Sequence, residues 1–107
     1  MQRIASVIGV SADGAEEYER LHADVWPAVL ARLQASNVTN FSIYRYQHML
    51  FSYMEYVGDD LEADMAAIAA DPTTLEWWEL CGPLQRPMHD RARGEWWKEI
   101  REVFHLD

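Results

Sequence analysis

The stretch that decides the fold is residues 38–57, VTNFSIYRYQHMLFSYMEYV. It is filled with aromatic and β-branched side chains, which favour the pleated, half-buried surface of a β-sheet. Two strands are therefore predicted, Val38–Tyr46 and Met49–Val57. Because only Gln47 and His48 join them, the two strands should form an antiparallel hairpin, with His48 in solvent.

A strand and an interrupted helix are predicted before this hairpin. Arg3–Val10 is rich in Ile and Val and alternates loosely, as a strand does. Asp13 and Glu16 have the spacing of a capping box, so a helix is expected to begin there. Pro27 lacks the N–H that a continuous helix needs, so this helix must kink or restart near Asp24.

A second helix and a last strand are predicted after the hairpin. Residues 58–60, Gly-Asp-Asp, can cap a helix whose apolar face carries Leu61, Met65 and Ile68. Asp71-Pro72 should end that helix. Three further expectations are a short turn capped by Thr73 or Thr74, a long surface loop over 82–94, and a last strand over Glu99–Leu106.

The resulting order of strand, helix, strand, strand, helix, strand predicts an α+β fold. The arrangement is ferredoxin-like, a βαββαβ chain with a four-stranded antiparallel sheet and both helices on one face, in a single domain over residues 1–107. Helices then leave the other sheet face uncovered. Since the strands are rich in aromatic residues, we expect that face to pack against the sheet of a second copy in a homodimer.

Composition narrows the classes of partner. Eighteen acidic side chains against nine Lys and Arg give the 107-residue chain a net charge of −9. Nucleic acids and anionic membranes are poor partners for such a chain, because binding phosphate requires basic side chains. The sequence has no signal-peptide pattern and no apolar run of about 18–20 residues, so a cytoplasmic protein is predicted. Because Cys81 is the one cysteine, no disulfide within the chain is possible.

The most informative local pattern is Tyr18, His22 and Trp26, spaced four residues apart. On a helix, this spacing places a phenol, an imidazole and an indole on one face. A histidine with an ordinary pKa of about 6.5 can give and take a proton near neutral pH, as general acid–base catalysis requires. The alternative interpretation is that all three are ordinary core residues.

Two tryptophan pairs form the second pattern. Adjacent helical residues point about 100° apart, so one of Trp77 and Trp78 should pack inward while the other lines a surface or cleft. An indole has a flat apolar face and one N–H donor, which suits a sugar ring, although two core or interface tryptophans would look the same. Trp96 and Trp97 are expected to pack under the 82–94 loop.

Several chemistries lack the residues that they need. The four histidines are scattered, with no pair at metal-ligand spacing, so no metal site is expected. There is no nucleophile-elbow serine and no glycine-rich phosphate loop. His89 should pair with neighbouring charges, whereas His105, on the predicted last strand, is a candidate for lining a site.

At these residues the chain resembles the L-rhamnose mutarotase family over nearly its whole length. The matching segments occur in the same order and at similar separations. They are Glu16-Glu17-Tyr18 followed by His22, then Val25-Trp26-Pro27, Asn40-Phe41-Ser42-Ile43-Tyr44, the Trp77-Trp78 pair and Glu102-Val103-Phe104.

The resemblance implies a dimeric α+β barrel that interconverts the anomers of a 6-deoxy-hexose without cofactor or metal. It implies that His22 is the proton donor and that Tyr18, Trp77 and Trp78 contact the sugar. The chain departs from the family at Phe41 and His105, where the rhamnose enzymes have tyrosines, so L-fucose or another 6-deoxy sugar remains an alternative. Two further alternatives are a cofactor-free monooxygenase or haem-binding barrel, by analogy of fold alone, and a non-catalytic small-molecule-binding dimer.

Overall fold

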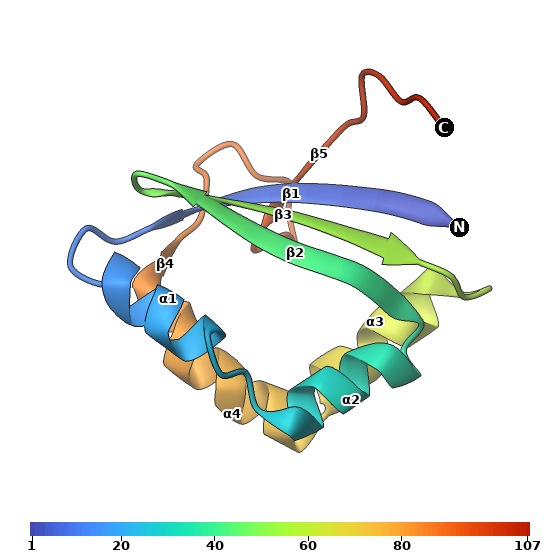
Figure 1. Ribbon diagram of the computed structural model, residues 1–107, viewed down its shortest axis with the longest axis horizontal. Coiled ribbons are helices and arrows are strands. Elements are labelled where there is room, and N and C mark those ends of the chain that lie inside the picture. The colour runs from blue at the N-terminus through green and yellow to red at the C-terminus, as the bar shows by residue number, and fades with distance from the viewer.

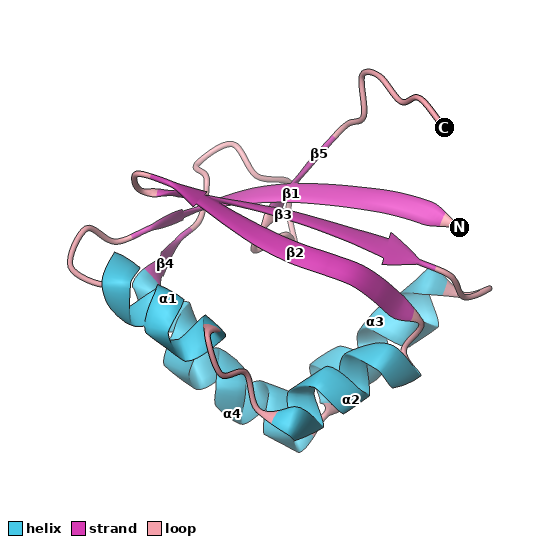
Figure 2. Cartoon of the chain, in the orientation of Figure 1, coloured by secondary structure: helices cyan, strands magenta, loops and turns pink.

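A curled antiparallel β-sheet carries four α-helices on one of its faces in the computed structural model, which describes residues 1–107 (Figures 1 and 2). The elements in chain order are β1 (Gln2–Val10), α1 (Ala15–His22), α2 (Pro27–Ala35), β2 (Val38–Tyr46), β3 (Met49–Tyr56), α3 (Leu61–Ala70), α4 (Pro72–Cys81), the 3-10 turn η1 (Gly82–Leu84), β4 (Gln85–Arg86) and β5 (Lys98–Ile100). No helix is long and apolar enough to cross a membrane.

The sheet has the order β2-β3-β1-β4, and every pair is antiparallel. This is the order of a ferredoxin-like fold, so the predicted fold class and the predicted central hairpin are confirmed. Ile8 of β1 lies opposite Leu50 of β3, and both side chains are fully buried under the helices. Their neighbours Val7 and Phe51 point to the opposite face because side chains alternate along a strand.

The prediction of one long last strand over Glu99–Leu106 was wrong. Two short segments share that edge of β1: β4 pairs with Gly9–Val10, and β5 pairs with Ala5–Val7. Continued in the same register, Val103 would lie opposite Gln2, the first residue of β1, so the residues beyond Val103 have no strand to pair with. Pairing in fact ends at Ile100, and residues 101–107 lie outside any strand. The segment 82–94 is likewise not all loop, because it contains η1 and β4.

The helix boundaries confirm some predicted caps and correct others. The chain does break between His22 and Pro27, and the Asp60 side chain does cap α3. The capping box at Asp13 was wrong, since Gly14 precedes α1 without a side-chain cap.

The short turn predicted near Thr73 is instead the ten-residue helix α4. Asp71 caps it by accepting hydrogen bonds from the backbone N–H of Thr74 at 2.9 Å and from its hydroxyl at 2.8 Å. Pro72 fits the first helical position because its missing N–H is not needed there. Thr73 and Thr74 are therefore inside the first turn rather than at the cap.

The sheet face away from the helices is open, as predicted (Figure 1). Large apolar side chains stay in contact with solvent there: Tyr44 and Tyr46 are 63% and 69% exposed, and Phe51 is 39% exposed. Val103, Phe104 and Leu106 of the C-terminal segment are also exposed. A monomer of this size rarely leaves so many aromatic rings of one sheet face in water.

Candidate active site

His22 is the last residue of α1, and its ring is half-buried. Its Nδ1 lies 2.8 Å from the backbone carbonyl oxygen of Tyr18, one turn earlier. A carbonyl oxygen only accepts, so Nδ1 must carry the hydrogen and donate it. In the neutral imidazole, Nε2 is then the nitrogen that holds a free lone pair.

Burial lowers the pKa of His22 from its ordinary value of 6.5, and the hydrogen bond to the Tyr18 carbonyl offsets part of that shift. The partly apolar surroundings disfavour the charged imidazolium. At neutral pH the ring is therefore uncharged. His22 is thus poised to accept a proton at Nε2 and to release it again.

Three aromatic side chains predicted to form the site gather with the His22 ring, two in direct contact with it and one through Trp77. The Tyr18 ring stacks on His22 with centroids 4.1 Å apart and planes inclined by 18°. Trp77 of α4 meets the imidazole edge-on at 5.2 Å, and Trp26 meets Trp77 edge-on at 5.3 Å. We call these four residues, Tyr18, His22, Trp26 and Trp77, the aromatic cluster.

The break between α1 and α2 positions Trp26 in this cluster. Pro27 begins α2 and cannot continue α1, so Trp26 takes an extended backbone conformation with φ −58° and ψ 133°. Trp77 is buried, whereas Trp78 is 46% exposed, as expected for adjacent helical residues. Trp78 therefore lies outside the stacked cluster, at the surface of α4.

Phe41 lies in an irregular stretch of β2, where the pairing with β3 shifts by one residue between Thr39 and Ser42. Beyond this bulge, Ile43 packs against the buried core, and Arg45 pairs with Glu19 of α1 at 2.7 Å. The bulge interrupts the alternation of side chains, so the periodicity of the strand does not assign Phe41 to either face. Its ring is 42% exposed and does not stack on the aromatic cluster.

His105 is not near the cluster. It lies in the segment after β5, where its Nε2 is 2.7 Å from Asp107 Oδ1. The prediction that it lies on a strand was wrong for the reason given above, that this segment has passed the end of β1.

Gln85 is the residue that sequence reasoning missed. It is buried on β4, and its Nε2 donates to the Tyr18 hydroxyl at 3.2 Å. A single glutamine between prolines belongs to no motif, and the two-residue strand that holds it is too short to show a pattern.

The thiol of Cys81 is buried beneath the cluster, and burial raises its pKa to about 11. It therefore stays protonated at neutral pH and is a poor nucleophile. No three His, Cys, Asp or Glu side chains are grouped so as to hold a metal ion.

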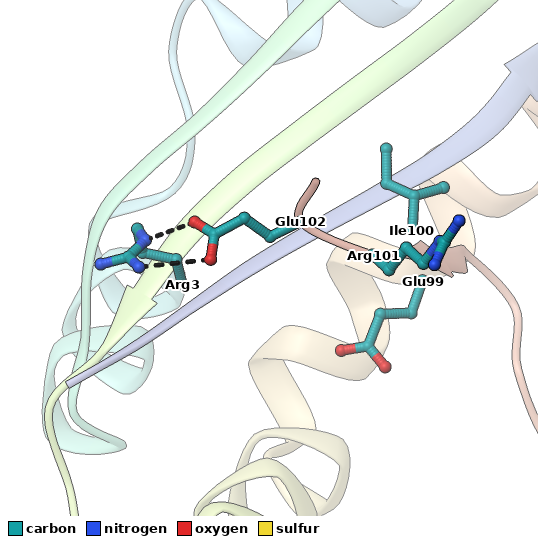
Figure 3. Close-up of a pocket in the computed structure, with 5 residues that line it drawn as sticks. All are labelled: Arg3, Glu99, Ile100, Arg101 and Glu102. Atoms are coloured by element: carbon teal, nitrogen blue, oxygen red, sulfur yellow. Dashed lines mark hydrogen bonds and ion pairs between the residues drawn. The ribbon is translucent and has the colours of Figure 1, made fainter. Parts of the chain in front are cut away.

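Two cavities lie on the open sheet face, and His22 lines neither of them. One, of about 360 Å³, is lined by Arg3 and by residues 99–102, at the end of β5 and just after it (Figure 3). The Arg3 guanidinium donates two hydrogen bonds to the Glu102 carboxylate. A second, of about 140 Å³, adds Ala5 and Tyr53, which lie opposite each other in β1 and β3. These cavities are hollows of the sheet face and the C-terminal segment rather than parts of the aromatic cluster.

The burial of the predicted site residues bears on the non-catalytic alternative. If the histidine and tryptophans merely packed, Tyr18, His22 and Trp78 should all be fully buried with no adjoining cavity. Neither of the two cavities described above is lined by these residues. Only Tyr18 is fully buried, at 2% exposed, whereas His22 is half-buried and Trp78 is exposed. Two of these three side chains therefore keep contact with solvent.

Known proteins match the chain over its full length. A family model described as L-rhamnose mutarotase matches residues 3–106. The L-rhamnose mutarotase of Opitutus terrae is 37% identical and the match covers 100% of both chains. The L-fucose mutarotase of Xanthomonas campestris pv. campestris is 35% identical over 99% of this chain and 89% of its own.

A solved structure has the same fold. The crystal structure of an L-rhamnose mutarotase from Formosa agariphila superposes with a TM-score of 0.78 at 19% identity, covering 100% of both chains. The full-length family match and the relatives above 30% identity agree with the resemblance found in the sequence. The chain belongs to the L-rhamnose mutarotase family.

Proposed function

We propose that this chain is an isomerase that interconverts the α and β anomers of L-rhamnose. Its family and its relatives named L-rhamnose mutarotase support this substrate. The observation that carries the chemistry is His22, a half-buried imidazole with Nδ1 held by a carbonyl and Nε2 free. L-fucose is the second candidate substrate, favoured by the similarity to an L-fucose mutarotase.

Opening the sugar ring moves one proton from the anomeric hydroxyl to the ring oxygen while the bond between that oxygen and C1 breaks. Both oxygens are bonded to C1, so one nitrogen can serve both. Neutral Nε2 accepts the hydroxyl proton as the C1 carbonyl forms, and the imidazolium donates it to the departing ring oxygen. The carbonyl rotates, the reverse transfers close the ring on its other face, and His22 ends neutral.

The surroundings of His22 suit this cycle. The Tyr18 carbonyl accepts from Nδ1 and so stabilises the transient imidazolium. Trp77 and Trp26 offer apolar rings to the C–H groups and C6 methyl of the sugar, and we propose contacts with Tyr18, Phe41 and Trp78 as well. The reaction changes no oxidation state, so it requires no redox cofactor.

We also propose that two copies pack through their open sheet faces. Tyr44, Tyr46 and Phe51 form an exposed aromatic surface on the hairpin, and no helix of the chain covers it. Packing this surface against its copy would bury rings that now contact water. The closed two-sheet barrel of the proposed dimer follows from that contact.

Saturation-transfer NMR tests the activity directly. Saturating one anomeric proton resonance of L-rhamnose should reduce the other anomer's signal when protein is added, because exchange becomes faster than relaxation. The same measurement on L-fucose ranks the two substrates. If the exchange of both sugars stays at the buffer rate, the proposed function is wrong.

A further inference from the structure

A hydrogen-bonded relay joins three distant parts of the chain beneath the aromatic cluster. Trp96 Nε1 donates to Gln85 Oε1 at 2.7 Å, and Gln85 Nε2 donates to the Tyr18 hydroxyl at 3.2 Å. Gln85 and Tyr18 are 9% and 2% exposed, so water has little access to their polar atoms. We call this chain of contacts the Trp96–Gln85–Tyr18 relay.

The donor at one end fixes the direction of every bond in the relay. An indole N–H can only donate, so the Gln85 amide must turn its oxygen toward Trp96. Its nitrogen then faces Tyr18, and a nitrogen of a neutral amide can only donate. The Tyr18 oxygen is therefore the acceptor in its bond with Gln85, and the phenol hydrogen remains unused.

No group of the protein accepts that hydrogen, since the contact with Gln85 is the one hydrogen bond of the Tyr18 hydroxyl. A buried donor without an acceptor is unfavourable, and a bound ligand that accepts from it removes the cost. Tyr18 stacks directly on His22, so its hydrogen is available beside the proton-transferring imidazole.

The two members of the relay that lie outside the aromatic cluster, Gln85 and Trp96, are held in place. Gln85 lies in β4 opposite Val10 of β1, which fixes its backbone at the sheet edge. The Arg91 guanidinium lies over the Trp96 ring, 5.9 Å from its centroid. The polarity of the relay is thus set by the fold before any ligand arrives.

We propose that Gln85 and Trp96 are positioning residues that hold Tyr18 as a hydrogen-bond donor to an oxygen of the bound sugar. The inference rests on the proposed mutarotase function and deepens it, because it assigns a direction to a contact that the pocket uses to recognise its substrate. A site that donates to a sugar oxygen rejects the analogue that lacks that oxygen.

Infrared spectroscopy of the free protein tests the direction. The C–O stretching band of a phenol shifts one way when its oxygen accepts a hydrogen bond and the other way when its O–H donates. The band of Tyr18 is identified as the one lost in Tyr18→Phe. We expect an accepting phenol in the free protein and a shift in the donating direction when L-rhamnose is added. A donating phenol in the free protein would overturn the proposal.

Two substitutions of Gln85 distinguish an effect of hydrogen-bond direction from an effect of side-chain packing. At pH 8 the carboxylate of Gln85→Glu still accepts from Trp96 but also captures the Tyr18 hydrogen, so kcat/KM for L-rhamnose should fall roughly tenfold. Gln85→Met removes both bonds yet leaves that hydrogen free, so it should retain more activity. Gln34→Glu, exposed on α2, is the charge-matched control and should match the unsubstituted protein.

Packing alone predicts the opposite order, because Glu is closer in shape to Gln than Met is. A Gln85→Met activity equal to or below that of Gln85→Glu would therefore refute the relay. The infrared result for the free protein needs no sugar. It consequently stands apart from the proposed function, which fails on its own if the unsubstituted protein does not accelerate anomer exchange.

Discussion

His22 shows how one backbone contact decides the chemistry of a side chain. The Tyr18 carbonyl fixes the hydrogen on Nδ1, and burial keeps the ring neutral near pH 7. A free imidazole would instead divide its population between two tautomers. The α1 backbone therefore presents a single basic nitrogen, Nε2, for proton transfer.

The depressed pKa of His22 gives the activity a defined pH dependence. Above the folded-state pKa, which lies below 6.5, Nε2 keeps its lone pair and kcat/KM should be level. As the pH falls through that pKa, the imidazolium forms and kcat/KM should drop. Saturation-transfer rates between pH 4.5 and 8, corrected for buffer exchange, measure the profile. An activity that rises toward acid pH would show that the imidazolium is the reactive form.

Phe41 is the residue at which substrate preference is most open to change. Its ring is 42% exposed, so Phe41→Tyr adds a hydroxyl with little effect on packing. We expect kcat/KM for L-rhamnose to rise several-fold, roughly the effect of one hydrogen bond. The measurement compares L-rhamnose with L-fucose. Unchanged values for both sugars would place Phe41 outside the binding site.

At the scale of elements, one aspartate organises the junction of α3 and α4. Asp71 ends α3 and caps α4, and the hydrogen bonds from Thr74 hold the pKa of its carboxyl below the ordinary range. This junction determines where α4, and with it Trp77, lies against α1.

Asp71→Ala should therefore lower the melting temperature by about 5 °C, the usual effect of losing a good N-cap in a small domain. Asp59→Ala is the matched control, because Asp59 is exposed and caps no helix. Thermal unfolding followed by circular dichroism measures both. If Asp71→Ala melts at the same temperature as the unsubstituted protein, Pro72 and the packing of α4 suffice to start the helix.

The elements that the sequence predicted well are those with strong local patterns. The hairpin strands and the break at Pro27 follow from residue types and proline geometry, which act within a few residues. The last strand failed because Phe104 and Leu106 have an apolar pattern but lie beyond the N-terminal end of β1, and pairing depends on the register with β1. No local stretch of sequence specifies which residues of two distant segments pair with each other.

The same distinction holds for the candidate site. Helical spacing correctly placed Tyr18 and His22 on one face of α1, and Trp77 of α4 joins them. Trp26 was expected on the same helical face, but it lies beyond the end of α1 and reaches the cluster through Trp77. Gln85 was not identified from the sequence because it contacts Tyr18 from a two-residue strand that lies 67 positions further along the chain. His105 was misplaced with the strand that was expected to carry it.

At the scale of the whole molecule, the open sheet face makes a prediction about assembly. Phe51→Lys places a charge at the centre of the proposed dimer contact, so it should convert the dimer to a monomer. Leu80→Lys is the control, because Leu80 is similarly exposed but lies on α4, on the helical side. Sedimentation equilibrium gives the mass of each. A monomeric unsubstituted protein would contradict the proposed dimer.

Proton transfer by His22 is most directly tested by anomer exchange in His22→Ala. We expect its exchange rate to fall at least about 100-fold, as for loss of a general acid–base group. His48→Ala, in the exposed hairpin turn, should keep the full rate. Circular dichroism should show the same fold for both variants. A His22→Ala protein that exchanges the anomers of L-rhamnose as fast as the unsubstituted protein would contradict the account.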